Sequence, residues 1–206
     1  MNDQLKLWQS QWGDDYQARN AVTEEVIQQR EMFWHTVFGG LNGQQVPQTI
    51  LEVGAGNGAN IQAMKNMFDK FNYEVTFDAV EPNQIAAINL AEQNIVNTIF
   101  PSLENVTKKY DLVFTSGVLI HIHPDKLLEF TKNIYKLSNR FIICAEYFRP
   151  EPETKPYHGE NQALFMRDFG GFYLDNFPLS CLTYGFAWKR LQGVDNLTFW
   201  TFKKAN

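Results

Sequence analysis

The chain has 206 residues, of which 44% are hydrophobic and 20% charged, and it carries a formal net charge of −5 at pH 7. This length suits a single domain spanning residues 1–206 and is short for two. The negative charge argues against a broad surface for nucleic acid or for an anionic membrane. Met1 to Trp12 contain no secretory apolar core, and no run approaches the roughly 20 apolar residues of a membrane span. We therefore expect a cytoplasmic protein that binds neither nucleic acid nor membrane.

Residues 1–40 are predicted to form a helical lid. Trp8, Trp12 and Tyr16 are spaced by four, which places them on one helical face. In one interpretation these aromatic side chains attach an amphipathic lid to the core. In another, Tyr16 and Arg19 lie at the mouth of a pocket, where an arginine can grip a carboxylate or phosphate with two N–H groups.

A longer helix is expected between Asn20 and the pair Gly39-Gly40. Asn20 is a good N-cap residue, and Glu24 and Glu25 would lie in the first turns, where negative charge suits the helix dipole. Glycine commonly ends a helix. We therefore predict a helix capped by Asn20 that runs to about Phe38.

A glycine-rich loop joins a short apolar run, residues 49–51, to a helix-like pattern that follows it. Glycines let the turn adopt dihedral angles that other residues avoid, and they leave the backbone open to a ligand. A dinucleotide fingerprint needs Gly-x-Gly-x-x-Gly/Ala, which Gly54-x-Gly56-x-x-Ala59 satisfies. A phosphate loop would end in Gly-Lys-Ser/Thr, and the chain has Gly58-Ala59-Asn60 instead. The glycines alone therefore leave a dinucleotide open and exclude a phosphate loop.

The residue ahead of the glycines introduces a third candidate ligand. The sequence Glu52-x-Gly54-x-Gly56-x-Gly58 closely resembles motif I of the class I S-adenosylmethionine (SAM) dependent methyltransferases. The resemblance implies that Glu52 lies next to the methionine part of SAM, with the glycine loop beneath it. The cofactor-binding residues that it implies are Glu52, Gly54, Ala55, Gly56, Asn57, Gly58 and Asn60.

An acid follows the second predicted strand. Residues 75–80 are typical of a strand and end in Glu81-Pro82-Asn83, one helix and one strand beyond the glycine loop. A carboxylate at this strand tip can accept hydrogen bonds from both ribose hydroxyls of a nucleotide. We therefore predict that Glu81 binds ribose, with Pro82 and Asn83 beside it. The alternative is an acid in a surface turn.

A third short strand, about residues 98–100, leads into Pro101-Ser102-Leu103-Glu104. The methyltransferase family that motif I resembles often has an acid at this turn, bonded to the adenine amine. Ser102 stands near that place in this chain, so the chain departs from the family pattern. We expect adenine to rely on backbone groups around Pro101 and Ser102 and on packing by Leu103.

The clearest strand, residues 110–115, runs into a turn, residues 116–124, with a Leu-x-His-x-x-Pro ending. This stretch looks like motif IV of small-molecule class I methyltransferases and would face the cofactor sulfonium at the strand tips. The residues expected against the cofactor are Ser116, Gly117 and Val118. His121 is predicted to form a hydrogen bond to the cofactor or to assist the substrate. The alternative is a structural histidine whose hydrogen bonds are made within the protein.

Cysteines and histidines do not predict a metal site. Cys144 and Cys181 lie in separate apolar runs without Cys-x-x-Cys spacing, so we expect two buried, reduced thiols. His121 and His123 alternate on an extended segment, but a metal would need a third ligand such as His158 or Glu146. We therefore predict no bound metal.

A fifth predicted strand, residues 141–145, ends at Glu146-Tyr147, at the rim of the same crevice. Glu146 is interpreted as a base or substrate ligand, or alternatively as a buried structural acid.

Residues 149–178 then form a substrate-side loop insertion, because their prolines should prevent regular pairing. Residues 180–188 and 196–203 alternate as two antiparallel strands with no helix between them. This closing hairpin fits a methyltransferase sheet and not the second half of a dinucleotide fold.

The combined motifs resemble a class I SAM-dependent methyltransferase, and several stretches resemble the pseudaminic acid biosynthesis-associated methylases. Those stretches are Trp12-Gly13-Asp14-x-Tyr16-x-x-Arg19-Asn20, Glu52-Val53-Gly54-Ala55-Gly56-x-Gly58, Gly117-Val118-Leu119-Ile120-His121, Glu146-Tyr147 and Arg167-Asp168-Phe169-Gly170. The resemblance implies an α/β, Rossmann-like fold with a mostly parallel seven-stranded sheet, a C-terminal antiparallel hairpin and an N-terminal helical lid. It also implies SAM as cofactor, S-adenosylhomocysteine (SAH) as product, and a sugar or other small metabolite of surface-glycan biosynthesis as substrate.

The substrate is expected to be a small anion, because basic side chains accompany the aromatic ones in the lid and the loop insertion. His121 and Glu146 are the predicted catalytic residues. The predicted substrate-binding residues are Trp12, Tyr16, Arg19, Asn20, Tyr147, Tyr157, His158 and Arg167. The alternatives are a nucleotide-dependent oxidoreductase or epimerase, and a non-catalytic partner protein of the same fold.

Overall fold

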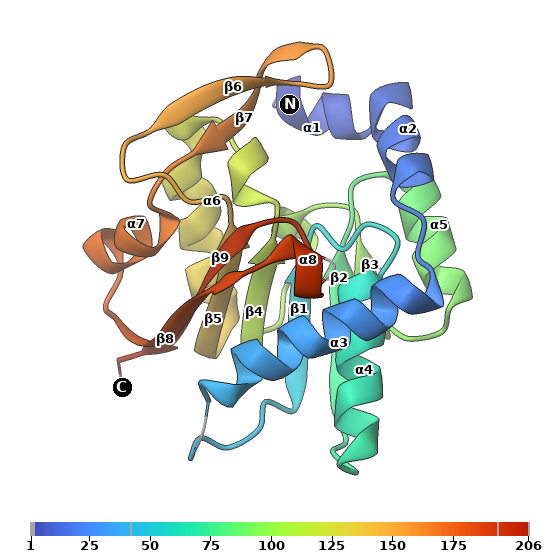
Figure 1. Ribbon diagram of the computed structural model, residues 1–206, viewed down its shortest axis with the longest axis vertical. Helices are drawn as coiled ribbons and strands as arrows, with labels where there is room; N and C mark the ends of the chain where they lie inside the picture. The colour runs from blue at the N-terminus through green and yellow to red at the C-terminus, as the bar shows by residue number, and fades with distance from the viewer. Residues whose placement is uncertain (1–2, 42, 193, 206) are drawn as a thin grey trace.

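The computed structural model describes residues 3–41, 43–192 and 194–205. A seven-stranded sheet in the order β3-β2-β1-β4-β5-β9-β8 forms its centre (Figure 1). The strands are β1 Thr49–Val53, β2 Thr76–Val80, β3 Ile99–Phe100, β4 Tyr110–Ser116, β5 Ser138–Glu146, β8 Leu179–Ala187 and β9 Leu197–Lys204. Strands β1 to β5 pair in parallel, whereas β9 runs antiparallel to both β5 and β8. The predicted Rossmann-like sheet with a closing antiparallel hairpin is confirmed.

Helices cover both faces of the sheet, because its central strands bury side chains on both sides. Phe114 of β4 packs against Trp34 on one face, with 4.9 Å between ring centroids, and Phe202 of β9 packs against Tyr173 on the other, at 5.4 Å. The helices of the first face are α3 Glu24–Gly39, α4 Ala59–Lys70 and α5 Gln84–Glu92. Those of the second face are α6 Pro124–Leu137 and α7 Phe169–Asn176. Residues 24–39 of the predicted lid therefore belong to the core layer.

The lid itself consists of two short helices, α1 Asp3–Trp8 and α2 Gln11–Arg19. The single helical face predicted for its aromatic residues is broken at Ser10, whose hydroxyl accepts a hydrogen bond from the Trp12 backbone N–H and starts α2. The Trp8 ring nevertheless lies 4.9 Å from the Trp12 ring and 5.0 Å from the Tyr16 ring. The three aromatic side chains therefore pack together although they belong to two helices.

The N-cap predicted for the next helix was wrong. Asn20 ends α2 as its C-cap, and its side-chain amide donates to the Tyr16 carbonyl at 2.8 Å. Thr23 is the N-cap of α3, with its hydroxyl accepting from the Val26 backbone N–H. Both residues are good caps, and the chain between them is long enough for each to close one helix.

The substrate-side segment is more regular than predicted. Residues 149–178 contain an antiparallel hairpin, β6 Glu153–Tyr157 and β7 Glu160–Met166, followed by α7. Pro156 lies within β6, where the pairing register shifts between Lys155 and Tyr157. Proline has no N–H to donate and is tolerated at such an irregularity, so it did not prevent pairing. Figure 1 shows this hairpin lying across the same edge of the sheet as α1 and α2.

A one-turn helix, α8 Lys189–Gln192, separates β8 from β9, where no helix was expected. Its four residues are too few to give a readable helical period. Within the described ranges, no helix has both the length and the apolar composition needed to cross a membrane.

Candidate active site

A cavity of about 330 Å³ lies at the carboxyl ends of the parallel strands, beneath the lid. Loops at this edge of an open α/β sheet form the crevice in which such folds bind ligands. The predicted residues that line it are Tyr16, Asn20, Gly54, Ala55, Gly56, Asn57, Asn60, Glu81, Pro82, Pro101, Ser102, Leu103, Ser116, Gly117, Val118, His121, Tyr147 and Tyr157. The structure therefore brings most of the predicted site together.

The glycine loop presents its backbone to the cavity. Gly54 has φ +78° and Gly56 has φ +53°, in the left-handed region that favours glycine. A Cβ on Gly54 would lie 2.6 Å from the Val118 side chain, and one on Gly56 would lie 3.3 Å from the Gln17 amide oxygen. Side chains here would fill the space above the loop. Gly58 serves as the N-cap residue of α4 and does not line the cavity.

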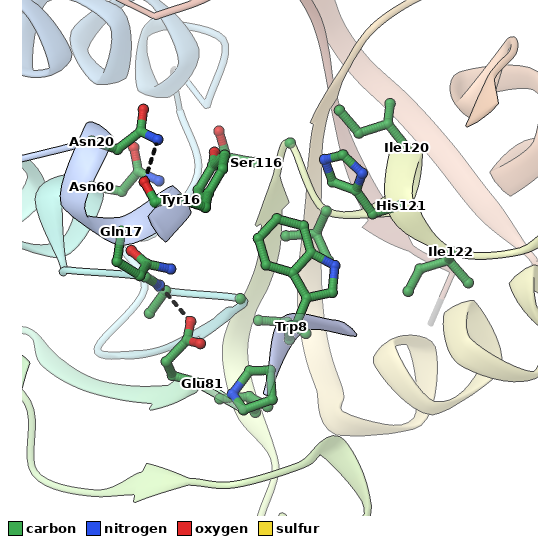
Figure 2. Close-up of a pocket in the computed structure, with 18 of the residues that line it drawn as sticks. Trp8, Tyr16, Gln17, Asn20, Asn60, Glu81, Ser116, Ile120, His121 and Ile122 are labelled. Atoms are coloured by element: carbon green, nitrogen blue, oxygen red, sulfur yellow. Dashed lines mark hydrogen bonds between the residues drawn. The ribbon is translucent and has the colours of Figure 1, made fainter. Parts of the chain in front are cut away.

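Glu81 lies at the end of β2 with its carboxylate at the cavity (Figure 2). One carboxylate oxygen accepts from the Gly56 N–H at 2.6 Å and the other from the Asn83 N–H at 2.8 Å. Burial raises the pKa of Glu81 to about 7, although both hydrogen bonds oppose that rise. Because an ionised carboxylate has about four lone-pair positions, each oxygen can accept one more donor.

Glu52 does not face the cavity, although it was predicted to lie beside the ligand. Its side chain is fully buried, and burial raises its pKa to about 8. The Asn60 amide nitrogen donates to Glu52 at 2.7 Å, and the Asn60 amide oxygen accepts from Arg30 Nη1 at 2.6 Å. Asn60 and Arg30 both line the cavity. Glu52 therefore acts on the site through Asn60, which it orients.

Arg30 is a site residue that the sequence did not reveal. It lies on α3, in a helix whose first-turn acids and mixed pattern gave no sign of a buried cation. Its Nε is buried and has no hydrogen-bond partner among the described residues. Burial lowers the pKa of the guanidinium, while the nearby Glu52 opposes that change. A buried cation with one neutral partner and a free donor is suited to an anionic ligand group.

Asn83 holds the lid and does not line the cavity. Its amide oxygen accepts from the Ala86 N–H and so caps α5. Its amide nitrogen donates to the Trp8 carbonyl at 3.1 Å and to the Asp14 carboxylate at 2.7 Å. Asn57 adds a second link from the glycine loop, donating to the Gln17 carbonyl at 3.2 Å. These bonds place the lid over the cavity.

The packing of α1 against α2 in the lid depends on the close approach of the Trp8 carbonyl to Gly13. A Cβ at this position would lie 2.0 Å from the Trp8 carbonyl oxygen, a backbone atom that cannot move without displacing α1. We expect Gly13→Ala to displace α1, increase proteolysis of the N-terminal segment and weaken SAH binding several-fold, while the thermal midpoint of the core changes little. Limited proteolysis and calorimetric titration would measure these effects.

Gly39→Ala is the matched control for Gly13→Ala, since a Cβ at Gly39 would meet no atom within 4 Å. Equal proteolysis of the two variants would contradict the steric role assigned to Gly13.

His121 lies inside the cavity beside Trp8, and Tyr16 and Asn60 face them from the other side (Figure 2). Its Nδ1 is 2.6 Å from the Ala163 carbonyl oxygen, which can only accept, so Nδ1 carries the proton. Burial lowers the pKa of His121 to about 4, which makes the ring neutral near pH 7. Its Nε2 therefore has a free lone pair for a donor in the cavity.

Glu146 lies beneath the site and not in it. Its side chain is fully buried, and its oxygens accept from the backbone N–H groups of Val118 at 3.2 Å and Ile120 at 3.4 Å. Burial raises its pKa to about 7. Of the two interpretations of the sequence, the structure supports the buried structural acid, which anchors the turn after β4. No three histidine, cysteine or acidic side chains among the described residues are grouped as a metal site requires.

Four of the predicted substrate-binding residues do not line the cavity: Trp12, Arg19, His158 and Arg167. The Trp12 indole N–H donates to the His158 carbonyl at 3.3 Å and so joins the lid to the β6–β7 hairpin. Arg19 is exposed on α2. The Arg167 guanidinium lies 5.8 Å from the centre of the Phe172 ring. Of the predicted substrate-binding residues, the tyrosines line the cavity and Trp12 joins the lid to the hairpin, whereas the basic residues do not line the cavity.

Asp195 is a second site residue absent from the prediction. It lies before β9 and lines the cavity, and it accepts from the Tyr147 hydroxyl at 2.6 Å. Its neighbours in the sequence are typical of a turn, so no local signal marked it.

Cys181 also differs from its prediction, since it is exposed on β8, whereas Cys144 is buried as expected.

A scan of the sequence against protein-family models gave no match, and neither did a search of curated proteins. Among solved structures, the magnesium protoporphyrin IX methyltransferase of Synechocystis PCC 6803 with bound SAM is 14% identical over 100% of this chain and 98% of that chain, with a TM-score of 0.68. The 1,6-didemethyltoxoflavin-N1-methyltransferase of Burkholderia thailandensis with bound SAH is 13% identical over 98% and 87%, with a TM-score of 0.70. A SAM-dependent methyltransferase of Leishmania major is 16% identical over 98% and 82%, with a TM-score of 0.71. The chain has the Rossmann-like fold of SAM-dependent methyltransferases.

Proposed function

We propose that this chain is a SAM-dependent methyltransferase that acts on a small molecule. The observation that carries the proposal is the order of groups along the cavity, which follows the order of the strands. Leu103 lies beyond β3, Glu81 ends β2, and the backbone of the glycine loop follows β1. Adenine, ribose and the methionine chain of SAM occur in this same order.

The residues present fit SAM by the chemistry of their donors and acceptors. Glu81 has two oxygens with lone pairs left for ribose hydroxyls, and Leu103 offers an apolar surface to adenine. The Ser102 hydroxyl already donates to Asn105 at 2.7 Å, which leaves backbone groups and packing for the base. Arg30, with its unpartnered Nε, would bind the methionine carboxylate. The ribose, the adenine and the carboxylate of the cofactor thus each have a partner.

The chain's contribution to the reaction would be positioning. When bound, SAM supplies a methyl group on a positively charged sulfur that is already activated for in-line displacement. The lid excludes water, and the glycine loop and Arg30 fix the cofactor. The cavity then holds the acceptor in line, which alone provides a large rate acceleration. The neutral His121 offers Nε2 as a hydrogen-bond acceptor near the reacting groups.

SAH titration separates this proposal from a nicotinamide-dependent oxidoreductase or epimerase. We expect SAH to bind with measurable heat and NAD to give none, because Glu81 and Arg30 match ribose and carboxylate groups while no second nucleotide half follows β5 in the described sheet. Binding of NAD without SAH would overturn the proposal. A non-catalytic partner protein would bind SAH but give no methylated product from labelled SAM.

The pH dependence of SAH binding provides a further test. Ribose hydroxyls donate to the ionised form of Glu81, whose pKa in the free protein is about 7. Binding therefore favours loss of the proton, so SAH affinity should rise by up to about tenfold per pH unit below that pKa and level off above it. The Glu81→Gln variant, which cannot ionise, should lose this slope. Calorimetry between about pH 6 and 8 would measure it. Equal slopes for both proteins would contradict the assignment.

The predicted anionic acceptor from surface-glycan biosynthesis remains a sequence-based hypothesis. The side chains on which it depended, Arg19, His158 and Arg167, lie outside the cavity lining. The coarser proposal, a small-molecule acceptor, is supported by the size of the cavity, about 330 Å³, and by the lid and hairpin that meet above it where Trp12 donates to the His158 carbonyl.

A further inference from the structure

The part of the cavity left for the acceptor lies at the β5 and β9 end of the sheet. This placement rests on the proposed function, in which the cofactor occupies the ends of β3, β2 and β1. The remaining lining comes from Tyr147 after β5, from Asp195 and Leu197 at β9, and from Tyr157 of the hairpin. His121 lies between the two parts, at the turn after β4.

Asp195 is held with both oxygens engaged and with lone pairs remaining. One oxygen accepts from the Tyr147 hydroxyl at 2.6 Å, and the other accepts from Lys189 Nζ at 2.9 Å. Burial alone would raise the pKa of Asp195, but the hydrogen bonds from Tyr147 and Lys189, together with the positive charges of Lys189 and Arg30, outweigh it, and the pKa is lowered. Asp195 is thus an ionised carboxylate, about half exposed, at the wall of the cavity.

Asp195 and His121 both offer hydrogen-bond acceptors to the cavity. His121 has its lone pair on Nε2, because Nδ1 donates to the Ala163 carbonyl. The described lining residues include two lysine or arginine side chains, Arg30 and Lys126, and Arg30 lies near enough to Asp195 for its charge to help lower the pKa of that carboxyl. Arg30 bonds Asn60 at the β1 end, and Lys126 lies on α6, which contacts the turn of Leu103 on the adenine side. The remaining lone pairs of Asp195 are therefore suited to a donor, and its negative charge disfavours an anion placed against it.

We propose that Asp195, held in place by Tyr147, binds the acceptor's nucleophilic group and selects an N–H or O–H donor over a carboxylate or phosphate. The acceptor is then an amine or a hydroxyl compound. An amine bound as its ammonium form first loses one proton to water, because an ammonium nitrogen has no lone pair. The nitrogen or oxygen lone pair then forms the bond to the methyl carbon while the carbon–sulfur bond breaks, and sulfur keeps that electron pair. The proton leaves the acceptor for a carboxylate oxygen of Asp195, which is exposed enough to pass it to water.

Three probes with the same phenyl ring and different charge test this selection: benzylamine, benzyl alcohol and benzoate. Their common ring suits the aromatic side chains of Trp8 and Tyr157, which line the cavity and lie 5.0 Å and 4.9 Å from the His121 ring. Calorimetric titration into the full chain saturated with SAH would measure their affinities. We expect benzylamine and benzyl alcohol to bind at least about tenfold more tightly than benzoate, because benzoate places a like charge against Asp195.

The Asp195→Asn variant keeps the shape of the side chain and an oxygen for the Tyr147 hydroxyl, but it removes the charge. We expect it to lose the preference for benzylamine and to gain affinity for benzoate, while it still binds SAH. Asp175→Asn, at an exposed position on α7, is the matched control and should retain the wild-type preference.

The outcomes separate this inference from the proposed function. Failure of the wild-type chain to bind SAH would remove the proposed function and the inference with it. If SAH binds and the three probes show no difference, from equal binding or from none, the selection by Asp195 is overturned. An unchanged preference in Asp195→Asn overturns it as well. A screen with labelled SAM provides the last check, since methylation on a carboxylate or phosphate oxygen would exclude the proposed acceptor class.

Discussion

Replacing Glu81 with alanine should weaken SAH binding at least 100-fold. The loss is large because two ribose hydroxyls would each lose a hydrogen bond to a charged carboxylate, at about 1.5–3 kcal/mol apiece. No other described side chain lies where both carboxylate oxygens now lie, between the Gly56 and Asn83 N–H groups. Isothermal titration at about pH 8, where Glu81 is ionised, would measure the change.

The controls for Glu81→Ala separate ligand binding from folding. Glu81→Gln keeps an oxygen for one of the two backbone donors, and it should bind SAH with an affinity between those of wild type and Glu81→Ala. Glu92→Ala, at an exposed position at the end of α5, should bind as wild type does. Circular dichroism would verify that each variant is folded. An affinity for SAH in Glu81→Ala within a few-fold of wild type would remove Glu81 from the ribose site.

The framework of the site was predictable because strand ends carry local signals. A short apolar run followed by a polar or glycine turn identifies the end of a buried strand, and parallel strands bring those ends together. The glycine loop, Glu81 and the turn at Ser116 were found in this way, and all three line the cavity. The closing hairpin was found from its alternating pattern.

The direction of a side chain at a strand end was not predictable in the same way. Glu146 and Tyr147 are adjacent at the end of β5, and one points beneath the turn while the other lines the cavity. Successive side chains of a strand point to opposite faces. If the face is assigned wrongly by one residue, the side chain that lines the cavity is confused with the one buried beneath the turn. Glu52 and Val53 show the same exchange at the end of β1, where Val53 lines the cavity.

Residues brought to the site from distant segments were missed for a different reason. Arg30 reaches Asn60, thirty residues away along the chain, because α3 packs on α4, and no motif surrounds it. Asp195 meets Tyr147 through the pairing of β5 with β9. Charged residues in helices and turns are usually solvated, so their types alone carry no evidence of a site. The basic residues chosen in their place, Arg19 and Arg167, satisfied the expected chemistry but lie outside the cavity lining.

Arg30→Met should weaken SAH binding by about 10- to 100-fold and leave 5′-methylthioadenosine binding within about twofold of wild type. A charge-assisted hydrogen bond contributes about 1.5–3 kcal/mol, and methylthioadenosine has the adenine and ribose of SAH but no carboxylate. Methionine fills much of the space of the arginine stem without its charge, so the packing against α4 is retained. Titration of both ligands into the same protein would measure the two effects.

The comparison of the two ligands distinguishes Arg30 from Glu81. Because both ligands carry ribose, Glu81→Ala should weaken both, whereas Arg30→Met should weaken SAH alone. Arg19→Met, exposed on α2, is the matched control and should change neither affinity. An equal loss for both ligands in Arg30→Met would mean that Arg30 acts through the orientation of Asn60 and the glycine loop. The carboxylate would then require another partner, and the assignment of cofactor parts to strand ends would hold for ribose and adenine alone.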